Sequence, residues 1–127
     1  MTFTLTILLL LAVTMQGEVE VLDNDAAALA VYEVAMNRVE DSRFPDALHE
    51  VLVSGFNGWR RLSPSRLDER YLDLAATALR SGHNWDHKAL YMLSVDDCRG
   101  LGADTARAVR SYRRGRWAVY LYEEWPR

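Results

Sequence analysis

The sequence predicts a single, mostly helical α+β domain with a small antiparallel β element. The chain has 127 residues, half of them hydrophobic, which suits one compact domain spanning residues 1–127. Apolar residues recur at helical spacing through much of the stretch from residue 5 to residue 81. Two later segments, 89–94 and 117–122, are short and rich in aromatic and aliphatic residues, as strands are. We expect these two strands to pair antiparallel.

The most apolar segment, Leu5 to Val13, predicts a first helix over about residues 4–18 that is packed on all sides. Polar Gln16 and Glu18 come too early for a membrane span, which needs about twenty apolar residues. A signal peptide would have basic residues before the apolar run and a small-residue cleavage motif after it, and neither is present, so a secretory signal is a weaker alternative for this segment. We therefore expect no stable membrane anchor. In the alternative interpretation, Leu5 to Val13 anchors a small interaction domain to a membrane.

The remaining elements follow from capping residues and spacing. Asp23 or Asn24 caps a second helix that runs through Val39, and residues 54–64 form either a binding loop or a packed surface turn. Three more helices are expected. The first is short and follows a turn at Phe44-Pro45-Asp46, with Pro45 in its first turn and Leu48, Val51 and Leu52 facing inward. The second begins at Ser63-Pro64 and ends at Ser81-Gly82, and the third is a short helix from Asp104 to Tyr112, with glycines on both sides.

The charge and the few cysteine and histidine residues limit what the chain is expected to bind. A net charge of -3 argues against broad binding to nucleic acid, although five arginines between residues 107 and 116 form a basic stretch that either meets a polyanion or simply faces water. Cys98 is a lone cysteine, and His49, His83 and His87 lack metal-binding spacing, so we expect no metal site and no cofactor.

Glu18 is the acidic residue of most interest, because it ends an apolar helix. Glu20 is two positions further on, where its side chain points to nearly the opposite side of a helix, so the two do not form a dyad. We expect burial at the end of an apolar helix to raise the pKa of a single carboxyl group and keep it protonated, as a general acid requires. Taken without other information, Glu18 is equally one of several acidic residues at a helix end.

Several short motifs resemble, in order, those of the SleB-like cell wall hydrolases. Residues 11–18, ending in Gly17-Glu18, resemble the segment that leads into the catalytic glutamate of that family. Ala35-Met36-Asn37-Arg38-Val39 is similar to its N-R-V helix end, and Arg43-Phe44-Pro45 to its F-P turn, followed by Val51 and Gly55-Phe56. Residues 88–93 resemble its G-A-x-x-F segment. The resemblance covers about residues 8–94 and fades afterwards.

The sequence also departs from the family pattern. Lys88 stands where a glycine is usual, Glu20-Val21-Leu22 lacks a glycine and a second acidic residue, and no histidine accompanies Tyr120-Leu121-Tyr122. These departures favour an alternative, in which the chain is a non-catalytic wall-binding or structural module that kept the fold.

The resemblance implies a lysozyme-like or lytic-transglycosylase-like domain that cleaves the β-1,4 bond between N-acetylmuramic acid and N-acetylglucosamine in peptidoglycan. Glu18 would be the catalytic acid. Hydrolysis would need a second carboxylate, for which Glu33 and Asp86 are weak candidates, whereas transglycosylation would not. Asn37, Phe56, Trp59 and Tyr91 are the expected substrate-binding residues, each also open to a core role. We expect a monomer that acts on the bacterial wall, delivered without a clear signal peptide and suited in size to a phage lysin.

Overall fold

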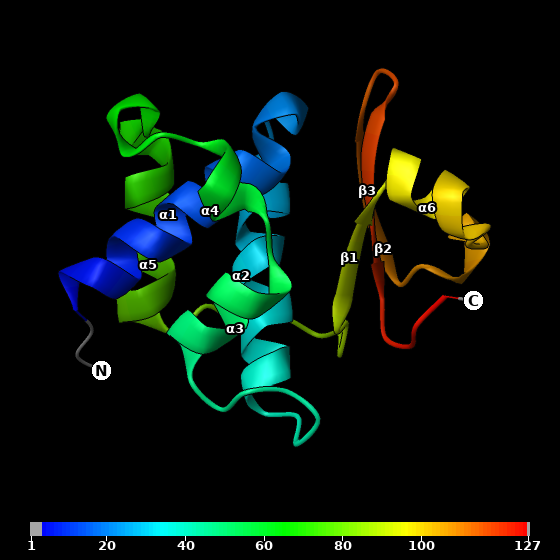
Figure 1. Ribbon diagram of the computed structural model, residues 1–127, viewed down its shortest axis with the longest axis horizontal. Helices are drawn as coiled ribbons and strands as arrows, with labels where there is room; N and C mark the ends of the chain where they lie inside the picture. Colours follow the sequence, from blue (N-terminus) through cyan, green and yellow to red (C-terminus); the bar gives the residue numbers. More distant parts are fainter. Residues whose placement is uncertain (1–3, 127) are drawn as a thin grey trace.

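The computed structural model describes residues 4–126 and has two parts, a group of helices and a small sheet with one further helix (Figure 1). The helical part contains α1 (Leu5–Val19), α2 (Asp25–Val39), α3 (Leu48–Gly55), α4 (Gly58–Arg61) and α5 (Glu69–Ser81). The other part contains β1 (Tyr91–Ser94), α6 (Val95–Leu101), β2 (Arg110–Arg114) and β3 (Trp117–Tyr122). Short 3-10 turns lie at Glu20–Leu22, Pro64–Arg66 and Thr105–Arg107. The predicted fold class, mostly helical α+β with a small antiparallel sheet, is confirmed.

Helix α1 starts at the surface and ends in the core. The Thr4 side chain caps it by accepting a hydrogen bond from the Ile7 N–H, which helps to fix the first turn. Leu11, Met15 and Val19 are fully buried, whereas the side chain of Leu5 is 69% exposed. The expectation of a helix packed on all sides is therefore wrong for its first turns. Residues 5–22 are long and apolar enough to cross a membrane by length and composition, with 44% of this stretch buried in the molecule.

Helix α2 is the central helix of the core. Asn24, one of the two predicted caps, accepts from the Ala27 N–H, while Asp23 adopts a left-handed backbone conformation with φ of 48°. Small, fully buried residues recur along α2: Ala27, Ala30, Val31, Val34 and Ala35. Their small side chains let α1, α3 and α5 pack closely against α2.

Three boundaries differ from those predicted. Helix α3 begins at Leu48, so Pro45 lies before it rather than in its first turn, although Val51 and Leu52 are buried as expected. The predicted loop 54–64 contains the four-residue helix α4. Helix α5 begins at Glu69, capped by Asp68, and not at Ser63-Pro64; it ends at Gly82 in the left-handed region, as expected.

The sheet has three antiparallel strands in the order β1-β3-β2. The two predicted strands do pair, with Tyr91 opposite Tyr122 and Ser94 opposite Val119. The helix expected over Asp104 to Tyr112 is wrong. Its first half is a single 3-10 turn and its second half is β2, which forms a hairpin with β3 through a turn containing Gly115 at φ of 60°.

Candidate functional site

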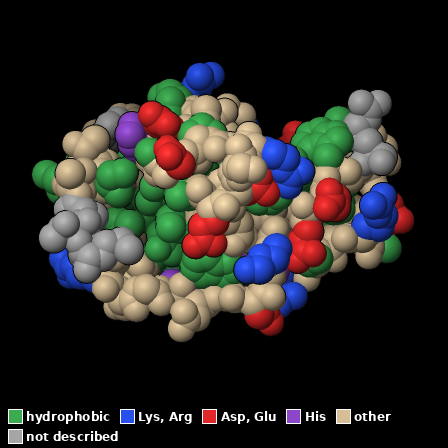
Figure 2. All heavy atoms as spheres, turned by 90° about the horizontal axis from the view of Figure 1, so that it is seen from below, with side chains coloured by type: hydrophobic (Ala, Val, Ile, Leu, Met, Phe, Trp, Pro, Cys, Tyr) green, Lys and Arg blue, Asp and Glu red, His purple; other side chains and the backbone are tan. Residues whose placement is uncertain are grey.

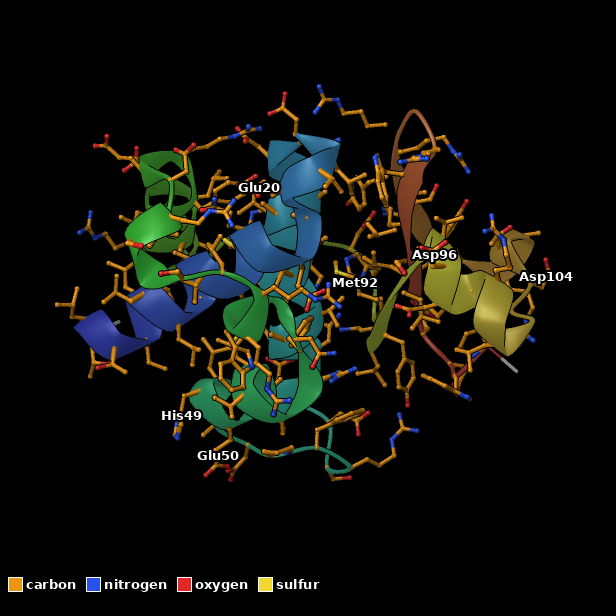
Figure 3. All side chains as sticks on the ribbon, turned by 45° about the horizontal axis from the view of Figure 1, so that its top comes forward. Glu20, His49, Glu50, Met92, Asp96 and Asp104 are labelled. Atoms are coloured by element: carbon orange, nitrogen blue, oxygen red, sulfur yellow. The ribbon has the colours of Figure 1, made fainter. Side chains whose placement is uncertain are left out.

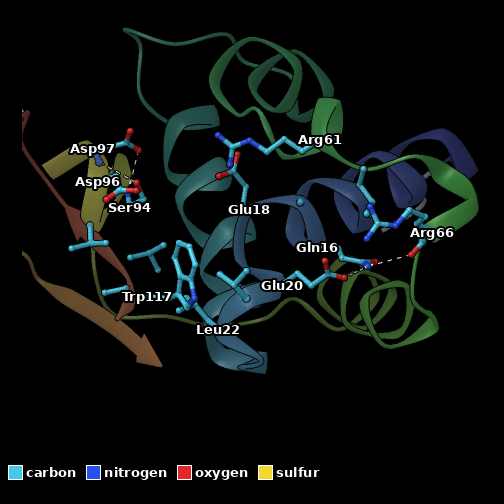
Figure 4. A pocket seen from close by; sticks show the side chains of 16 residues that line it. Gln16, Glu18, Glu20, Leu22, Arg61, Arg66, Ser94, Asp96, Asp97 and Trp117 are labelled. Carbon is cyan, nitrogen blue, oxygen red and sulfur yellow. Dashed lines mark hydrogen bonds between the residues drawn. The ribbon is translucent and has the colours of Figure 1, made fainter. Parts of the chain in front are cut away.

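A cleft lies where the end of α1 faces β1 and α6. It consists of two adjoining cavities of about 460 Å³ and about 270 Å³. Five residues line both cavities: Glu18, Arg61, Ser94, Asp97 and Val119. Figure 4 shows Glu18 and Arg61 on the helical wall, with Ser94, Asp96 and Asp97 on the opposite wall. In the wider view of Figure 3, Glu20 and Asp96 likewise lie on opposite sides of the space between the two parts.

Glu18 is half-buried in the last turn of α1, in the middle of this cleft. Its Oε1 accepts hydrogen bonds from the backbone N–H groups of Asn57 and Gly58, both at 2.8 Å. Its Oε2 makes no hydrogen bond with any residue from 4 to 126. One oxygen is thus fixed by the start of α4, and the other is available to a ligand in the cleft.

Two facing glycines allow this contact between α1 and α4. A Cβ atom on Gly17 would lie 2.0 Å from the carbonyl oxygen of Gly58, and a Cβ on Gly58 would lie 2.4 Å from the carbonyl oxygen of Thr14. Both distances are far inside van der Waals contact with backbone atoms, which cannot rotate away. Glycine at both positions therefore brings the N–H of Gly58 within reach of Glu18.

Glu20 also lines the larger cavity, but it is held separately from Glu18. The Gln16 side chain donates to Glu20 Oε2 at 2.5 Å and accepts from the Asp68 N–H at 2.8 Å. Glu18 and Glu20 thus line one cavity but have different partners and no bond to one another.

Phe56 and Tyr91, two of the predicted substrate-binding residues, line the smaller cavity together with Glu18. Phe56 is buried, and Tyr91 packs edge to face against Phe44 and Trp125. Phe56 has little free surface of its own, because the Arg38 guanidinium lies over its ring. Exposed aromatic rings beside a carboxyl group are a combination that suits carbohydrate, because sugar faces stack on such rings while hydroxyl groups bond to polar atoms. Trp117 and Trp125 add two further rings, one to each cavity.

Asn37 and Trp59 lie outside both cavities. Asn37 is buried, donates to the carbonyl oxygen of Ala89 at 2.9 Å and accepts from the Trp85 indole at 2.9 Å, so it holds the loop that leads into β1. Trp59 packs under the Arg60 guanidinium, 4.9 Å from the ring centroid, and its buried indole nitrogen has no hydrogen-bond partner in the described chain. The structure brings neither residue to Glu18.

The two weak candidates for a second carboxylate also lie elsewhere. Glu33 is buried in α2, where its two oxygens bond to His83 Nε2 at 2.5 Å and His87 Nε2 at 2.8 Å. Asp86 is exposed and pairs with Arg110. Within residues 4–126, no group of three or more His, Cys, Asp or Glu side chains is placed to hold a metal ion.

Asp97 and Arg38 are cleft residues that the sequence did not single out. Asp97, on α6, lines both cavities with Glu18, and its carboxylate accepts from the Ser94 N–H at 3.3 Å in a capping box. Arg38 lines the smaller cavity, and its burial lowers the pKa of its guanidinium. The Ser94-to-Asp97 spacing is a capping signal that sequence reading could have found, but nothing local connects either residue to Glu18.

Comparisons of the chain with models of protein families, with curated proteins and with solved structures give no match.

Proposed function

We propose that the chain cleaves the glycan strands of peptidoglycan, with Glu18 as the catalytic acid. The observation that carries this proposal is the position of Glu18 in the middle of a cleft lined by aromatic rings, with one carboxyl oxygen unoccupied by the rest of the described chain. The resemblance of the sequence to SleB-like hydrolases supplies the substrate class. A lysozyme-like arrangement, with the acid between a helical part and a sheet, is part of the same proposal.

The chemistry needs only one carboxyl group if the substrate supplies the nucleophile. Glu18 gives its proton to the glycosidic oxygen as the bond from that oxygen to C1 of the muramic residue breaks. The 6-hydroxyl oxygen of the same residue bonds to C1, and its proton returns to Glu18. The products are an anhydromuramic end and a free N-acetylglucosamine end, and no water is consumed.

We expect Glu18→Gln to lower glycan cleavage by at least about a hundredfold, because the amide cannot give a proton. The fold should survive, since the amide oxygen can still accept from the N–H groups of Asn57 and Gly58. The measurement is digestion of purified peptidoglycan, with released muropeptides identified by mass spectrometry. Glu50→Gln is the matched control, because Glu50 is exposed on α3, away from the cleft (Figure 3). Unchanged activity of Glu18→Gln would exclude Glu18 as the acid.

The same digestion separates transglycosylation from hydrolysis. Anhydromuropeptides from the wild type indicate a transglycosylase, whereas products heavier by one water indicate a muramidase. In the second case Asp97 is the carboxylate to test, because it lines both cavities with Glu18 while Glu33 and Asp86 line neither. Asp97→Asn would then lower cleavage, and Asp46→Asn is its control, because Asp46 is exposed and lines neither cavity.

One observation favours a second candidate, a non-catalytic wall-binding module. Glu18 Oε1 receives two N–H groups at the start of α4, as a capping carboxylate does, so the side chain has a structural use independent of catalysis. In this alternative the wild type releases no muropeptides but sediments with insoluble peptidoglycan. Glu18→Ala would then lower the free energy of unfolding by about 1 kcal/mol, the typical effect of a lost cap.

A further inference from the structure

Arg38 lies among three aromatic rings beside the smaller cavity. Its guanidinium carbon is 4.8 Å from the ring centroid of Phe44, 5.3 Å from that of Phe56 and 5.6 Å from that of Tyr91. Its Nε donates to the carbonyl oxygen of Leu90 at 2.7 Å, and Nη1 donates to that of Gly55 at 3.5 Å. The guanidinium is therefore fixed in orientation by the ends of α3 and of the loop before β1.

This fixed cation has no carboxylate partner among residues 4–126, and its Nη2 donates no hydrogen bond there. Burial disfavours a charged guanidinium, and it lowers the pKa of Arg38. An anion that bonded to Nη2 would offset that cost, and a guanidinium suits carboxylates because it presents parallel N–H donors in one plane.

Arg61 is a second cation without a partner at the same cavity. It lines both cavities and forms neither a hydrogen bond nor an ion pair with any residue that the structure describes. The acidic groups of the smaller cavity, Glu18 and Asp97, accept hydrogen bonds from backbone N–H groups, and neither forms an ion pair with Arg38 or Arg61. The two arginines thus remain available, and the cavity of about 270 Å³ has room for a small anionic group.

We infer that Arg38 and Arg61 form a subsite for a carboxylate of the ligand. This inference rests on the proposed function for the identity of the ligand. In peptidoglycan the carboxylates belong to the peptide stem attached to muramic acid, so the subsite makes the protein selective for stem-bearing strands. Phe56 and Tyr91, which flank Arg38, border the same anionic group.

The test uses a probe without a glycosidic bond, N-acetylmuramoyl-L-alanyl-D-glutamate, and the same compound with both glutamate carboxyl groups converted to carboxamides. Binding is measured by titration calorimetry at about 50 mM salt, where attraction between charges is only moderately screened. We expect the acid to bind at least tenfold more tightly than the diamide. Arg61→Gln should remove most of that preference. Arg60→Gln is the matched control, because the neighbouring Arg60 lies over Trp59 and lines neither cavity.

Arg38→Lys provides the second variant, since it keeps the charge but loses the planar set of donors. We expect it to lower affinity for the acid while leaving that for the diamide unchanged, and near-ultraviolet circular dichroism checks that it folds. Equal binding of acid and diamide by the wild type, or an unaltered preference in Arg61→Gln, would overturn the subsite.

The outcomes for the subsite and for catalysis are separate. Cleavage of glycan without selective binding of the acid overturns the subsite and leaves the proposed activity intact. Selective binding without cleavage supports the subsite and contradicts the enzyme. Absence of both contradicts both.

Discussion

The hydroxyl group of Tyr122 lies in a small core between β3 and the segment after α6. It donates to the carbonyl oxygen of Asp104 at 3.3 Å and contacts the Cys98 sulfur at 3.6 Å. Burial is the main cause that raises the pKa of Tyr122 from 10.0 to about 12, with further contributions from Cys98. The folded protein therefore keeps this proton at a pH where the unfolded chain has lost it.

We expect the stabilising effect of Tyr122 to decline between pH 10 and about pH 12. Below pH 10 the side chain is neutral in both states, so its full contribution is present; above that value ionisation favours the unfolded chain. Tyr122→Phe should lower the free energy of unfolding by about 1 kcal/mol at pH 8, for the lost hydrogen bond. By about pH 11 the difference between wild type and variant should shrink, as measured by urea unfolding. A difference that is the same at both pH values would contradict this assignment.

At the same scale, the sequence located Glu18 but not the surroundings of Asn37. The helical pattern of residues 5–19 was enough to place Glu18 in the last turn of α1. Asn37, by contrast, bonds to Ala89, 52 positions further along the chain. An amide suits a sugar hydroxyl and a backbone carbonyl equally well, and only the folded chain shows which one it meets.

Among the elements, the crossing of α1 and α4 depends most directly on residue size. We expect Gly17→Ala to lower the free energy of unfolding by about 2 kcal/mol, because the new methyl group overlaps the backbone of Gly58. It should also move the Gly58 N–H away from Glu18 and reduce any glycan cleavage.

Gly100→Ala is the matched control for this effect. Gly100 lies within α6, and a Cβ atom there meets nothing within 4 Å. This variant should be unchanged or more stable by up to about 1 kcal/mol, because alanine favours the helix. Thermal unfolding of both variants makes the comparison, and a stable Gly17→Ala protein would mean that α1 and α4 lie further apart.

Element prediction succeeded where an apolar face repeats and failed where none does. Helix α2 and strand β3 have buried faces that their sequences show plainly. In strand β2, Tyr112 is half-buried and the other four residues are exposed. The sequence therefore lacks the alternation of apolar and polar residues that indicates a strand, and its arginines resemble the solvated face of a helix. Helix α4, with four residues, is too short for any helical period to appear.

At the scale of the whole molecule, the cleft depends on how the sheet is held against the helices. The loop between α5 and β1 carries His83, Trp85 and His87, and these bond to Glu33 and Asn37 on α2. That attachment positions β1 and α6 opposite Glu18. Sequence patterns describe each element separately, so they could identify one wall of the cleft but not Asp97 on the other.

At the same scale, α1 is either a helix of the protein core or a membrane anchor, and the burial of its side chains favours the core. Its second half is buried, while Leu5 and Leu9 are exposed, and Figure 2 shows hydrophobic side chains grouped at this end of the molecule. A helix cannot fill the core and span a bilayer at once, because withdrawing Leu11, Met15 and Val19 would leave a cavity.

We therefore expect Leu11→Asp to unfold the protein, with a loss above about 4 kcal/mol for an unpaired buried charge, whereas Leu5→Asp should change the free energy of unfolding by less than about 0.5 kcal/mol. Circular dichroism and chemical unfolding give both values, and membrane fractionation of the expressed chain gives a second readout. The wild type and Leu5→Asp should both remain in the soluble fraction. If the wild type instead sediments with membranes and Leu5→Asp releases it, α1 is an anchor, and the core packing of its second half is not the state that the protein adopts.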